Sequence, residues 1–256
     1  MRWMPRGCDH LPAAALRRSE SLHLSVFIYA RTDSRRLPGK VLRPFGDTTL
    51  LQQVIDRARQ VDANSWSLLT SDRRVDDRLA TAARRAGLEV VRGSATDLVA
   101  RTVTAIKTLH VDRFVRINGD SPLFEPRLVN AALQRGSREG LISNVIERRF
   151  PYGVATEIVD ATLFRRLAGT ARPEESEHVT KHLYRQPLTA TILSLTQQVD
   201  HSHIRLAVDT IEDYGRVLAL FDTPSSRLAP YWELLSLPEP VLNWHSVGAP
   251  LEGLDS

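Results

Sequence analysis

The sequence is poor in the residues that form disulfide frameworks and cysteine-rich metal sites. Its 256 residues include a single cysteine, Cys8, so an internal disulfide is excluded. So little cysteine is typical of proteins from a reducing compartment, and we expect a cytoplasmic protein. The sequence also lacks any apolar run approaching the roughly 18 residues that a membrane-spanning helix needs. We therefore expect no membrane association.

Two further absences narrow the function. The triphosphate-binding pattern Gly-x-x-x-x-Gly-Lys-Ser/Thr does not occur. Aromatic residues make up 6% of the chain and are not interleaved with basic residues, as they are in proteins that bind single-stranded nucleic acid. The 34 Lys and Arg outnumber the 30 Asp and Glu only slightly, and the excess is spread along the chain. The expected partner is therefore a small anionic molecule and not nucleic acid.

Strand-like and helix-like segments alternate along most of the chain. Apolar, β-branched runs at 24–30, 66–70, 88–91 and 113–117 predict buried parallel strands, and segments with apolar residues at helical spacing follow them. This alternation predicts an α/β protein with a Rossmann-like, mostly parallel sheet and helices on both of its faces.

The length suits one large domain with a small insertion. We expect residues 1–20 to be a disordered N-terminal extension and residues 21–222 to form the domain. Residues 223–256 are rich in proline and predict an irregular C-terminal tail. Within the domain, alternating apolar residues predict further strands at 153–159 and 204–208. Another segment, 174–185, is polar with a thin apolar stripe, a composition that often packs on a partner subunit.

The ten residues 31–40, Arg-Thr-Asp-Ser-Arg-Arg-Leu-Pro-Gly-Lys, connect the first strand to a helix and hold four cations. Arginine forks bind pairs of phosphate oxygens, and lysine adds a point charge. Gly39 lets the backbone approach phosphates closely. Since α/β sheets bind ligands at the strand ends, this loop favours a polyanion such as a triphosphate. A solvated basic loop is the alternative.

Acidic residues follow two other predicted strands. Asp120 lies in Asn-Gly-Asp-Ser-Pro-Leu after the strand 113–117, and Asp209 follows the strand 204–208. Aspartate oxygens suit Mg²⁺ that is shared with substrate phosphates, whereas an Asx-turn at Asp120 is the alternative. Thr70-Ser71-Asp72 and Arg92-Gly93-Ser94 also follow strands, where turn and helix-cap roles are equally compatible with their composition.

Three of these patterns together resemble the motifs of the sugar-activating cytidylyltransferases. Arg31-x-x-Ser34-x-Arg36-Leu-Pro-Gly-Lys40 resembles the signature loop of the CMP-KDO and CMP-sialic acid synthetases, and above all of the spore-coat polysaccharide cytidylyltransferases. The segment 119–123 resembles the family's Gly-Asp-x-Pro-Leu motif, and 208–213 resembles Val/Ile-Asp-Thr-x-Glu-Asp. The resemblance covers about residues 24–222.

The resemblance implies a nucleotide-diphospho-sugar transferase type of fold and a transfer of CMP from CTP to a sugar, with release of pyrophosphate. It implies that Arg31, Arg36 and Lys40 act on the phosphates and that Asp120 and Asp209 hold Mg²⁺ as the cofactor. The residues implied in nucleotide binding are Ala30, Arg31, Ser34, Gly39, Lys40, Thr70, Ser71, Asp72, Arg92, Gly93, Asn118 and Gly119. No residue is identified as a general base.

The acceptor is less closely specified. Glu177-His178-Val-Thr resembles a motif of the spore-coat group, and Glu157 lies where that group has Phe-Pro-Asp-Gly-x-Asp-x-Glu, but Tyr152 and Ala155 replace its two acids. The residues implied in acceptor binding are Arg116, Asn144, Glu157, Glu177 and His178. An acidic sugar of the ulosonic acid type is implied. A phosphonate or alditol phosphate acceptor, another nucleotide, or a non-catalytic nucleotide-binding subunit are the alternatives.

The resemblance also implies a homodimer. The family's usual interface corresponds to residues 150–190, which we therefore expect to serve both acceptor binding and dimerisation.

Overall fold

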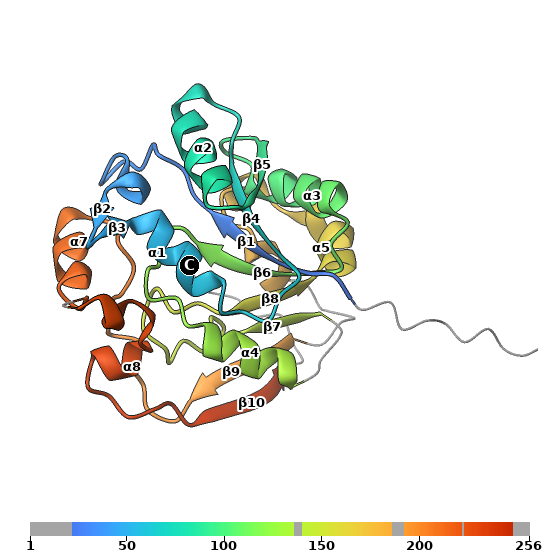
Figure 1. The fold of residues 1–256 in the computed structure, drawn as a ribbon. Helices are drawn as coiled ribbons and strands as arrows, with labels where there is room; N and C mark the ends of the chain where they lie inside the picture. Colours follow the sequence, from blue (N-terminus) through green and yellow to red (C-terminus); the bar gives the residue numbers. More distant parts are fainter. Residues whose placement is uncertain (1–21, 136–139, 186–191, 222, 248–256) are drawn as a thin grey trace, which may run out of the picture.

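The computed structural model describes residues 22–135, 140–185, 192–221 and 223–247. Its main sheet contains β1 (Leu24–Tyr29), β4 (Ser65–Ser71), β5 (Glu89–Gly93), β6 (Arg113–Asn118), β7 (Leu141–Ser143), β8 (Glu157–Asp160), β9 (Ile192–Gln197) and β10 (Leu242–Val247). A small ribbon pairs β2 (Pro44–Phe45) with β3 (Thr48–Thr49). The strand order of the main sheet is β10-β9-β7-β8-β6-β1-β4-β5, as can be followed in Figure 1.

Several of the α-helices of the described residues begin at polar side-chain caps. They are α1 (Leu50–Ala58), α2 (Asp77–Arg85), α3 (Leu98–Leu109), α4 (Pro126–Gln134), α5 (Ala161–Leu167), α6 (Lys181–Tyr184), α7 (Ile211–Leu218) and α8 (Tyr231–Leu234). The Asp97 carboxylate accepts a hydrogen bond from the backbone of Ala100 and so caps α3. Thr210 and Asp213 form a capping box at the start of α7.

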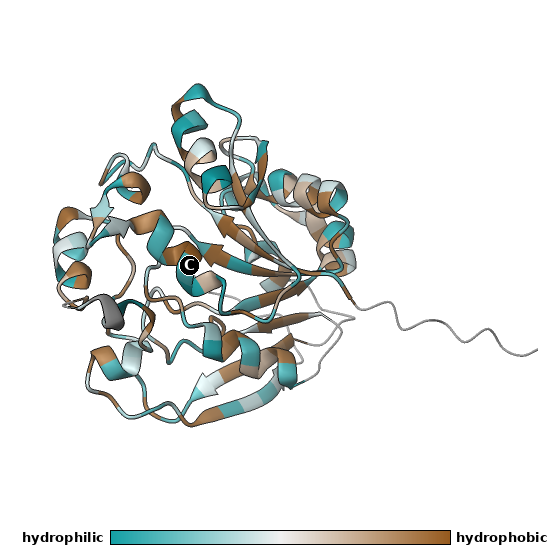
Figure 2. Ribbon diagram, viewed as in Figure 1, coloured by the Kyte–Doolittle hydropathy of each residue, from teal (hydrophilic) through white to brown (hydrophobic). Residues whose placement is uncertain are grey.

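Helices cover both faces of the sheet, as predicted. Val26 and Ile28 of β1 pack in a core cluster with residues of α1, α2 and α4, whereas Phe27 and Tyr29 pack in a cluster with residues of α3 and α5. A strand buried on both faces needs an apolar side chain at almost every position, which is why its sequence does not alternate. Figure 2 shows β1 as mainly hydrophobic, between the helices on the two faces of the sheet.

The sheet is mixed, and its parallel part positions the loops that matter. β1 lies parallel to both β6 and β4, and β4 lies parallel to β5. β8 runs antiparallel to β6 and β7. The carboxyl ends of β1, β4, β5 and β6 therefore lie along one edge, where α/β sheets bind ligands.

One predicted strand is confirmed only in part, and another is wrong. Of 153–159, only residues 157–159 lie in a strand, within β8, because Gly153 has a φ of 103° and turns the chain beforehand. Residues 204–208 form a loop with an isolated bridge between Arg205 and Tyr152. The backbone amide of Leu206 donates to the Tyr152 carbonyl at 2.7 Å, so this segment pairs with another loop and not with the sheet.

The prediction of an irregular tail is wrong for residues 223–247. This segment contains α8 and ends in β10, which pairs antiparallel with β9 along its full length. Its prolines precede the strand and do not interrupt it. The predicted disorder of residues 1–20 lies outside the described residues, and the predicted domain limits stay predictions.

The segment 174–185 packs on its own domain. Val179 and Leu183 belong to the core cluster on the α3 side of the sheet, and the His182 ring stacks edge-on against Phe164 at 5.3 Å between ring centres. The apolar stripe is thus buried within the chain and does not itself indicate a partner subunit. None of the helices that the structure describes is long and apolar enough to cross a membrane.

Candidate active site

A cavity of about 520 Å³ opens at the carboxyl edge of the parallel strands. The loop after β1 supplies most of its wall, and the loops after β4, β5 and β6, together with Arg101 of α3 and with Glu177, supply the rest. Its lining includes six cationic side chains, those of Arg31, Arg35, Arg36, Lys40, Arg73 and Arg101. Three acidic side chains, those of Asp33, Asp120 and Glu177, also line it. The excess of cations favours a polyanionic ligand. We call this space the first cavity.

The loop 31–40 is held by buried hydrogen bonds. Gly39 adopts a φ of 69°, and its amide donates to the Thr32 carbonyl at 2.7 Å. The amide and hydroxyl of Thr32 both donate to the Asp76 carboxylate, at 2.8 and 2.6 Å. Burial acts to raise the pKa of Asp76, but hydrogen bonds from Ser71 and Thr32 outweigh it and lower that pKa. An ionised Asp76 therefore anchors the cationic loop.

Lys40 joins the two aspartates that the sequence singled out. Its ammonium lies 2.7 Å from Asp120 Oδ2 and 3.1 Å from Asp209 Oδ1, and the two oxygens are therefore at most 5.8 Å apart, the sum of these distances. The ammonium also donates to the Val208 carbonyl at 2.8 Å. Only 7% of Lys40 is exposed, so the three groups form a largely enclosed cluster.

Asp209 attracts two further cations. Arg36 lies 3.3 Å from the same oxygen that Lys40 contacts, and Arg205 donates to the other oxygen. The Arg205 guanidinium also stacks on the Tyr152 ring, 4.4 Å from its centre. Although 204–208 is not a strand, the amide of Val208 donates to the Asp120 carbonyl at 2.8 Å, which brings the two aspartates together.

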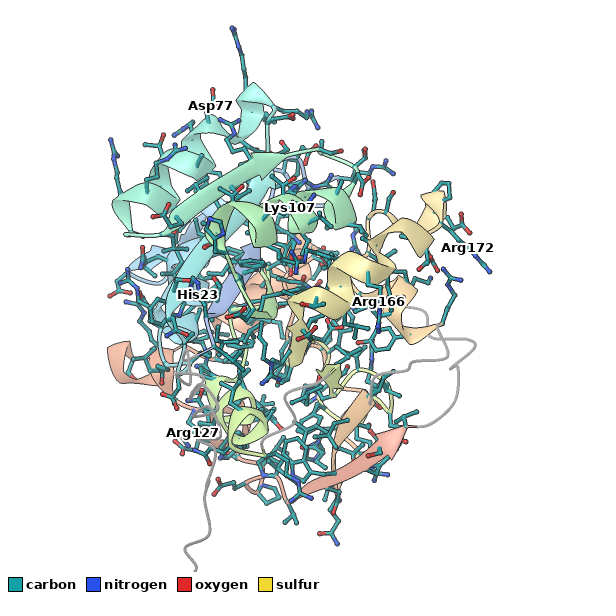
Figure 3. All side chains as sticks on the ribbon, turned by 90° about the vertical axis from the view of Figure 1, so that its right-hand side faces the viewer. His23, Asp77, Lys107, Arg127, Arg166 and Arg172 are labelled. Carbon is teal, nitrogen blue, oxygen red and sulfur yellow. The ribbon has the colours of Figure 1, made fainter. Side chains whose placement is uncertain are left out.

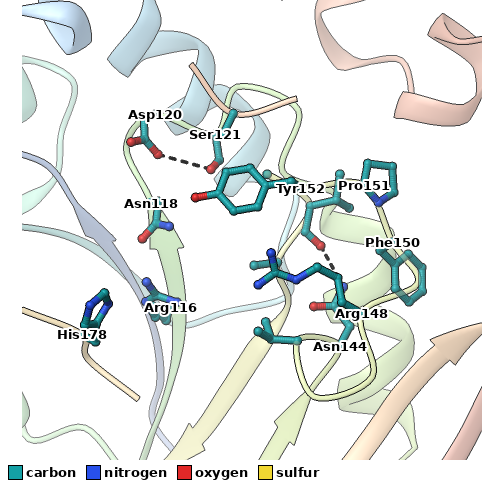
Figure 4. Close-up of a pocket in the computed structure, with 15 residues that line it drawn as sticks. Arg116, Asn118, Asp120, Ser121, Asn144, Arg148, Phe150, Pro151, Tyr152 and His178 are labelled. Carbon is teal, nitrogen blue, oxygen red and sulfur yellow. Dashed lines mark hydrogen bonds between the residues drawn. The ribbon is translucent and has the colours of Figure 1, made fainter. Parts of the chain in front are cut away.

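A second cavity, of about 200 Å³, is also lined by Asp120 (Figure 4). Arg116 and His178 lie at one side of it and Tyr152 with Arg148 at the other. Burial and then the charge of Lys181 lower the pKa of His178, so its imidazole is neutral at pH 7. Asp120 lines both cavities and stands where they meet.

Glu157 lies behind Arg116 and lines neither cavity. Its carboxylate is 1% exposed and accepts hydrogen bonds from Arg116, from the Thr180 hydroxyl at 2.6 Å and from the Tyr184 hydroxyl. Burial acts to raise its pKa, whereas Arg116 and these hydrogen bonds bring the pKa below its usual value. An ionised Glu157 thus fixes the orientation of Arg116.

The structure brings many of the predicted nucleotide and acceptor residues to the two cavities. Ala30, Arg31, Ser34, Arg36 and Lys40 line the first cavity, and Arg116, Asn118, Asn144 and His178 line the second. Glu177, which we expected beside the acceptor, lines the first cavity instead. Gly119 lies beside the site: a Cβ there would be 2.6 Å from the Cβ of Ala30, so only glycine lets β6 end this close to β1.

Eight predicted nucleotide contacts do not line the first cavity: Asn118 lines the second, and Gly39, Thr70, Ser71, Asp72, Arg92, Gly93 and Gly119 line neither. Ser71 donates to Asp76, and Arg92 binds the carbonyls of Ser71 and Arg73. These residues shape the loops, and their neighbours Arg73, Ala95, Thr96 and Arg101 reach the cavity instead. One feature of the sequence could have indicated that Arg101 points inward. It lies one helical turn after Leu98, on the side of α3 that faces the protein interior.

Comparisons with known proteins show relatives of this chain over most of its length. The model of a family described as cytidylyltransferase matches residues 25–230. The spore coat polysaccharide biosynthesis protein SpsF of Bacillus subtilis is 32% identical over 209 residues, which cover 78% of this chain and 87% of SpsF. A 3-deoxy-manno-octulosonate cytidylyltransferase of Anaeromyxobacter dehalogenans is 28% identical over 191 residues, 68% of this chain and 78% of that protein.

Similarity extends to a solved structure. A cytidylyltransferase from Leptospira borgpetersenii superposes with a TM-score of 0.79 at 31% identity, covering 84% of this chain and 93% of that one.

Proposed function

Because the chain belongs to the cytidylyltransferase family, we propose that it transfers CMP from CTP to an acidic sugar and releases pyrophosphate. The observation that carries this proposal is the position of Asp120 between two cavities. One cavity is large and cationic, as a triphosphate requires, and the other is smaller and contains arginine, asparagine and histidine side chains. Two substrates bound in these cavities would meet at Asp120.

In this arrangement the acceptor hydroxyl attacks the α-phosphorus from the second cavity. The bond between the α-phosphorus and its bridging oxygen to the β-phosphate breaks, pyrophosphate leaves into the first cavity, and the proton of the acceptor hydroxyl passes to solvent. Arg31 and Arg36 line that cavity and supply charge to the leaving group. Such a transfer depends mainly on positioning the reactants and stabilising charge that develops in the transition state.

Asp120 and Asp209 have the chemistry to hold a divalent cation. Their carboxylates already converge on one cation, the Lys40 ammonium, and carboxylate oxygens are ligands that Mg²⁺ prefers. Bound Mg²⁺ would supply Lewis-acid stabilisation of phosphate charge. Lys40 would then be released from the aspartates and become available to the phosphates of CTP.

The acceptor cavity favours an acidic ligand. Arg116 and Arg148 bring two guanidinium groups to a space of about 200 Å³, which suits a small acceptor. The similarity to a 3-deoxy-manno-octulosonate cytidylyltransferase supports a sugar acid of this general kind. The guanidinium groups of Arg148 and Arg205 both lie over the Tyr152 ring, 5.3 and 4.4 Å from its centre, so this side of the cavity is aromatic and cationic.

A pyrophosphate-release assay with CTP and Mg²⁺ tests the proposal. The acceptor panel contains ulosonic acids, alditol phosphates and phosphonates, and each is also tested with ATP, GTP and UTP. We expect release with CTP and an ulosonic acid, and little release when either is replaced. Turnover only with a phosphonate or alditol phosphate would contradict the acceptor part, and turnover with every nucleotide would contradict the choice of CTP. A homodimer and a cytoplasmic location stay predictions from the sequence.

A further inference from the structure

Arg101 is a buried arginine of α3 that lines the first cavity. It is 1% exposed, and its Nε and Nη2 both donate to the Ser94 carbonyl, the former at 3.1 Å. Within the described part of the chain no carboxylate forms an ion pair with Arg101. Burying a charged group is unfavourable unless a partner compensates it. An acceptor atom of a ligand in the cavity would provide such a partner.

The surrounding chain is built to hold this side chain. A Cβ at Gly93 would lie 3.3 Å from Cγ of Arg101 and 3.6 Å from its Cβ, so glycine leaves the room that the arginine stem occupies. Gly93 does not have a positive φ, so a left-handed backbone is not the reason for a glycine at this position. Its role is to leave space for the arginine side chain. The glycine that we expected to contact the nucleotide thus acts through Arg101.

A second arginine lies beside the first. Arg31 donates to the carbonyl of Ala95, the residue after the one that Arg101 contacts. Burial and then the charge of Arg31 lower the pKa of Arg101, as expected for two guanidinium groups held close together. Two cations on adjacent carbonyls, both lining one cavity, form a site for hydrogen-bond acceptors.

We propose that Arg101 is a nucleotide-binding residue whose guanidinium donates to an acceptor atom of CTP. A phosphate oxygen and the acceptor edge of cytosine are the two sources of such an atom. The inference rests on the proposed CTP-dependent transfer, and it adds a contact from the β5–α3 side of the cavity to those of the loop 31–40.

Binding calorimetry on Arg101→Met tests the inference, with CTP, CMP and pyrophosphate each titrated in the presence of Mg²⁺. We expect the dissociation constant for CTP to rise roughly 10- to 100-fold, the range for a lost hydrogen bond to a charged group. A loss for pyrophosphate but not CMP would assign the contact to the β- and γ-phosphates. A loss for CMP but not pyrophosphate would assign it to the nucleoside monophosphate.

Lys107→Met is the matched control, because Lys107 is an exposed cation on the same helix (Figure 3). It should leave all three dissociation constants unchanged, which separates a local contact from the loss of one positive charge. Unchanged CTP binding in Arg101→Met, or an equal loss for CMP and pyrophosphate, would overturn the inference. Equal losses would indicate a general distortion of the cavity.

If Arg101→Met lacks a cooperative unfolding transition, Arg101→Lys replaces it in the same titrations. Lysine keeps the charge and most of the stem but loses the planar fork, so at least a roughly tenfold loss for CTP is expected. A wild-type affinity in that variant would overturn the inference. Failure of the wild-type protein to bind CTP would overturn the proposed function itself, and this inference with it.

Discussion

The ammonium of Lys40 lies 2.7 Å from the carboxylate of Asp120 and also contacts Asp209. A divalent cation held by these two carboxylates, as proposed, would therefore compete with the lysine when no nucleotide is bound. Because a protein cation already neutralises the pair, the metal would first have to displace it. This competition leads to a measurable consequence.

Lys40→Met should bind Mn²⁺ more tightly than the wild-type protein in the absence of CTP. The two carboxylates would face each other without the lysine that neutralises them and would attract the metal more strongly. We therefore expect the affinity for Mn²⁺ to rise roughly 10-fold or more. Titration calorimetry measures it. Arg43→Met removes a cation from the same region and should bind Mn²⁺ as the wild-type protein does. Weaker Mn²⁺ binding by Lys40→Met would mean that the aspartate pair is not the metal site.

The two aspartates should act as one unit in turnover. Asp120→Asn and Asp209→Asn should each reduce turnover roughly 1000-fold or more, because each removes one of two charges that the proposed site needs. The double variant should be barely slower than either single one, since groups that act together are non-additive. Steady-state rates of pyrophosphate release measure this, and thermal unfolding checks that each variant folds. Additive losses would indicate two separate roles.

Glu157→Gln should impair use of the acceptor and spare CTP. Without the carboxylate, Arg116 loses the partner that orients it toward the second cavity. We expect kcat/KM for the acceptor to fall roughly 10- to 100-fold, the cost of a misplaced contact, while the dissociation constant for CTP stays unchanged. Glu175→Gln is the control, because it also removes a buried carboxylate that pairs with an arginine, Arg185. A similar loss in both variants would show that the effect is general destabilisation.

His182 should make the fold less stable in mild acid. Burial lowers the pKa of this fully enclosed imidazole from 6.5 to about 4; the charge of Glu175 acts to raise the pKa, and that of Arg185 acts to lower it further. Because the folded-state pKa lies below the unfolded one, the stability is fully present above pH 6.5. It is lost as the pH falls from 6.5 to 4, by about 3 kcal/mol.

Urea unfolding at pH 7 and pH 5 measures this loss. His182→Leu should lose less stability than the wild-type protein over that interval, because leucine takes up no proton. Replacement of the exposed His203 by leucine should leave the loss unchanged. The same pH dependence in His182→Leu and the wild-type protein would contradict the assignment.

The sequence by itself determined the alternating architecture and the position of the cationic loop. β1 is buried on both faces and so is apolar at almost every position, a pattern that is visible without any contact information. Gly39 and Gly119 were also singled out as nucleotide contacts, although the structure gives them local roles: Gly39 adopts a φ of 69°, and Gly119 lets β6 end close to β1. Patterns of this kind can be recognised in the sequence because they reflect backbone conformation and burial, which depend mainly on residues nearby in the chain.

Only the tertiary structure decided which polar residues point into the site. Asp209 reaches Asp120 from a loop that pairs with Tyr152, although the sequence indicated a strand there. Arg92 and Ser71 turn to bind the backbone and a buried carboxylate, whereas Arg101 enters the cavity through the space beside Gly93. The direction of a long polar side chain depends on partners far away in the chain, which residue type and spacing do not encode.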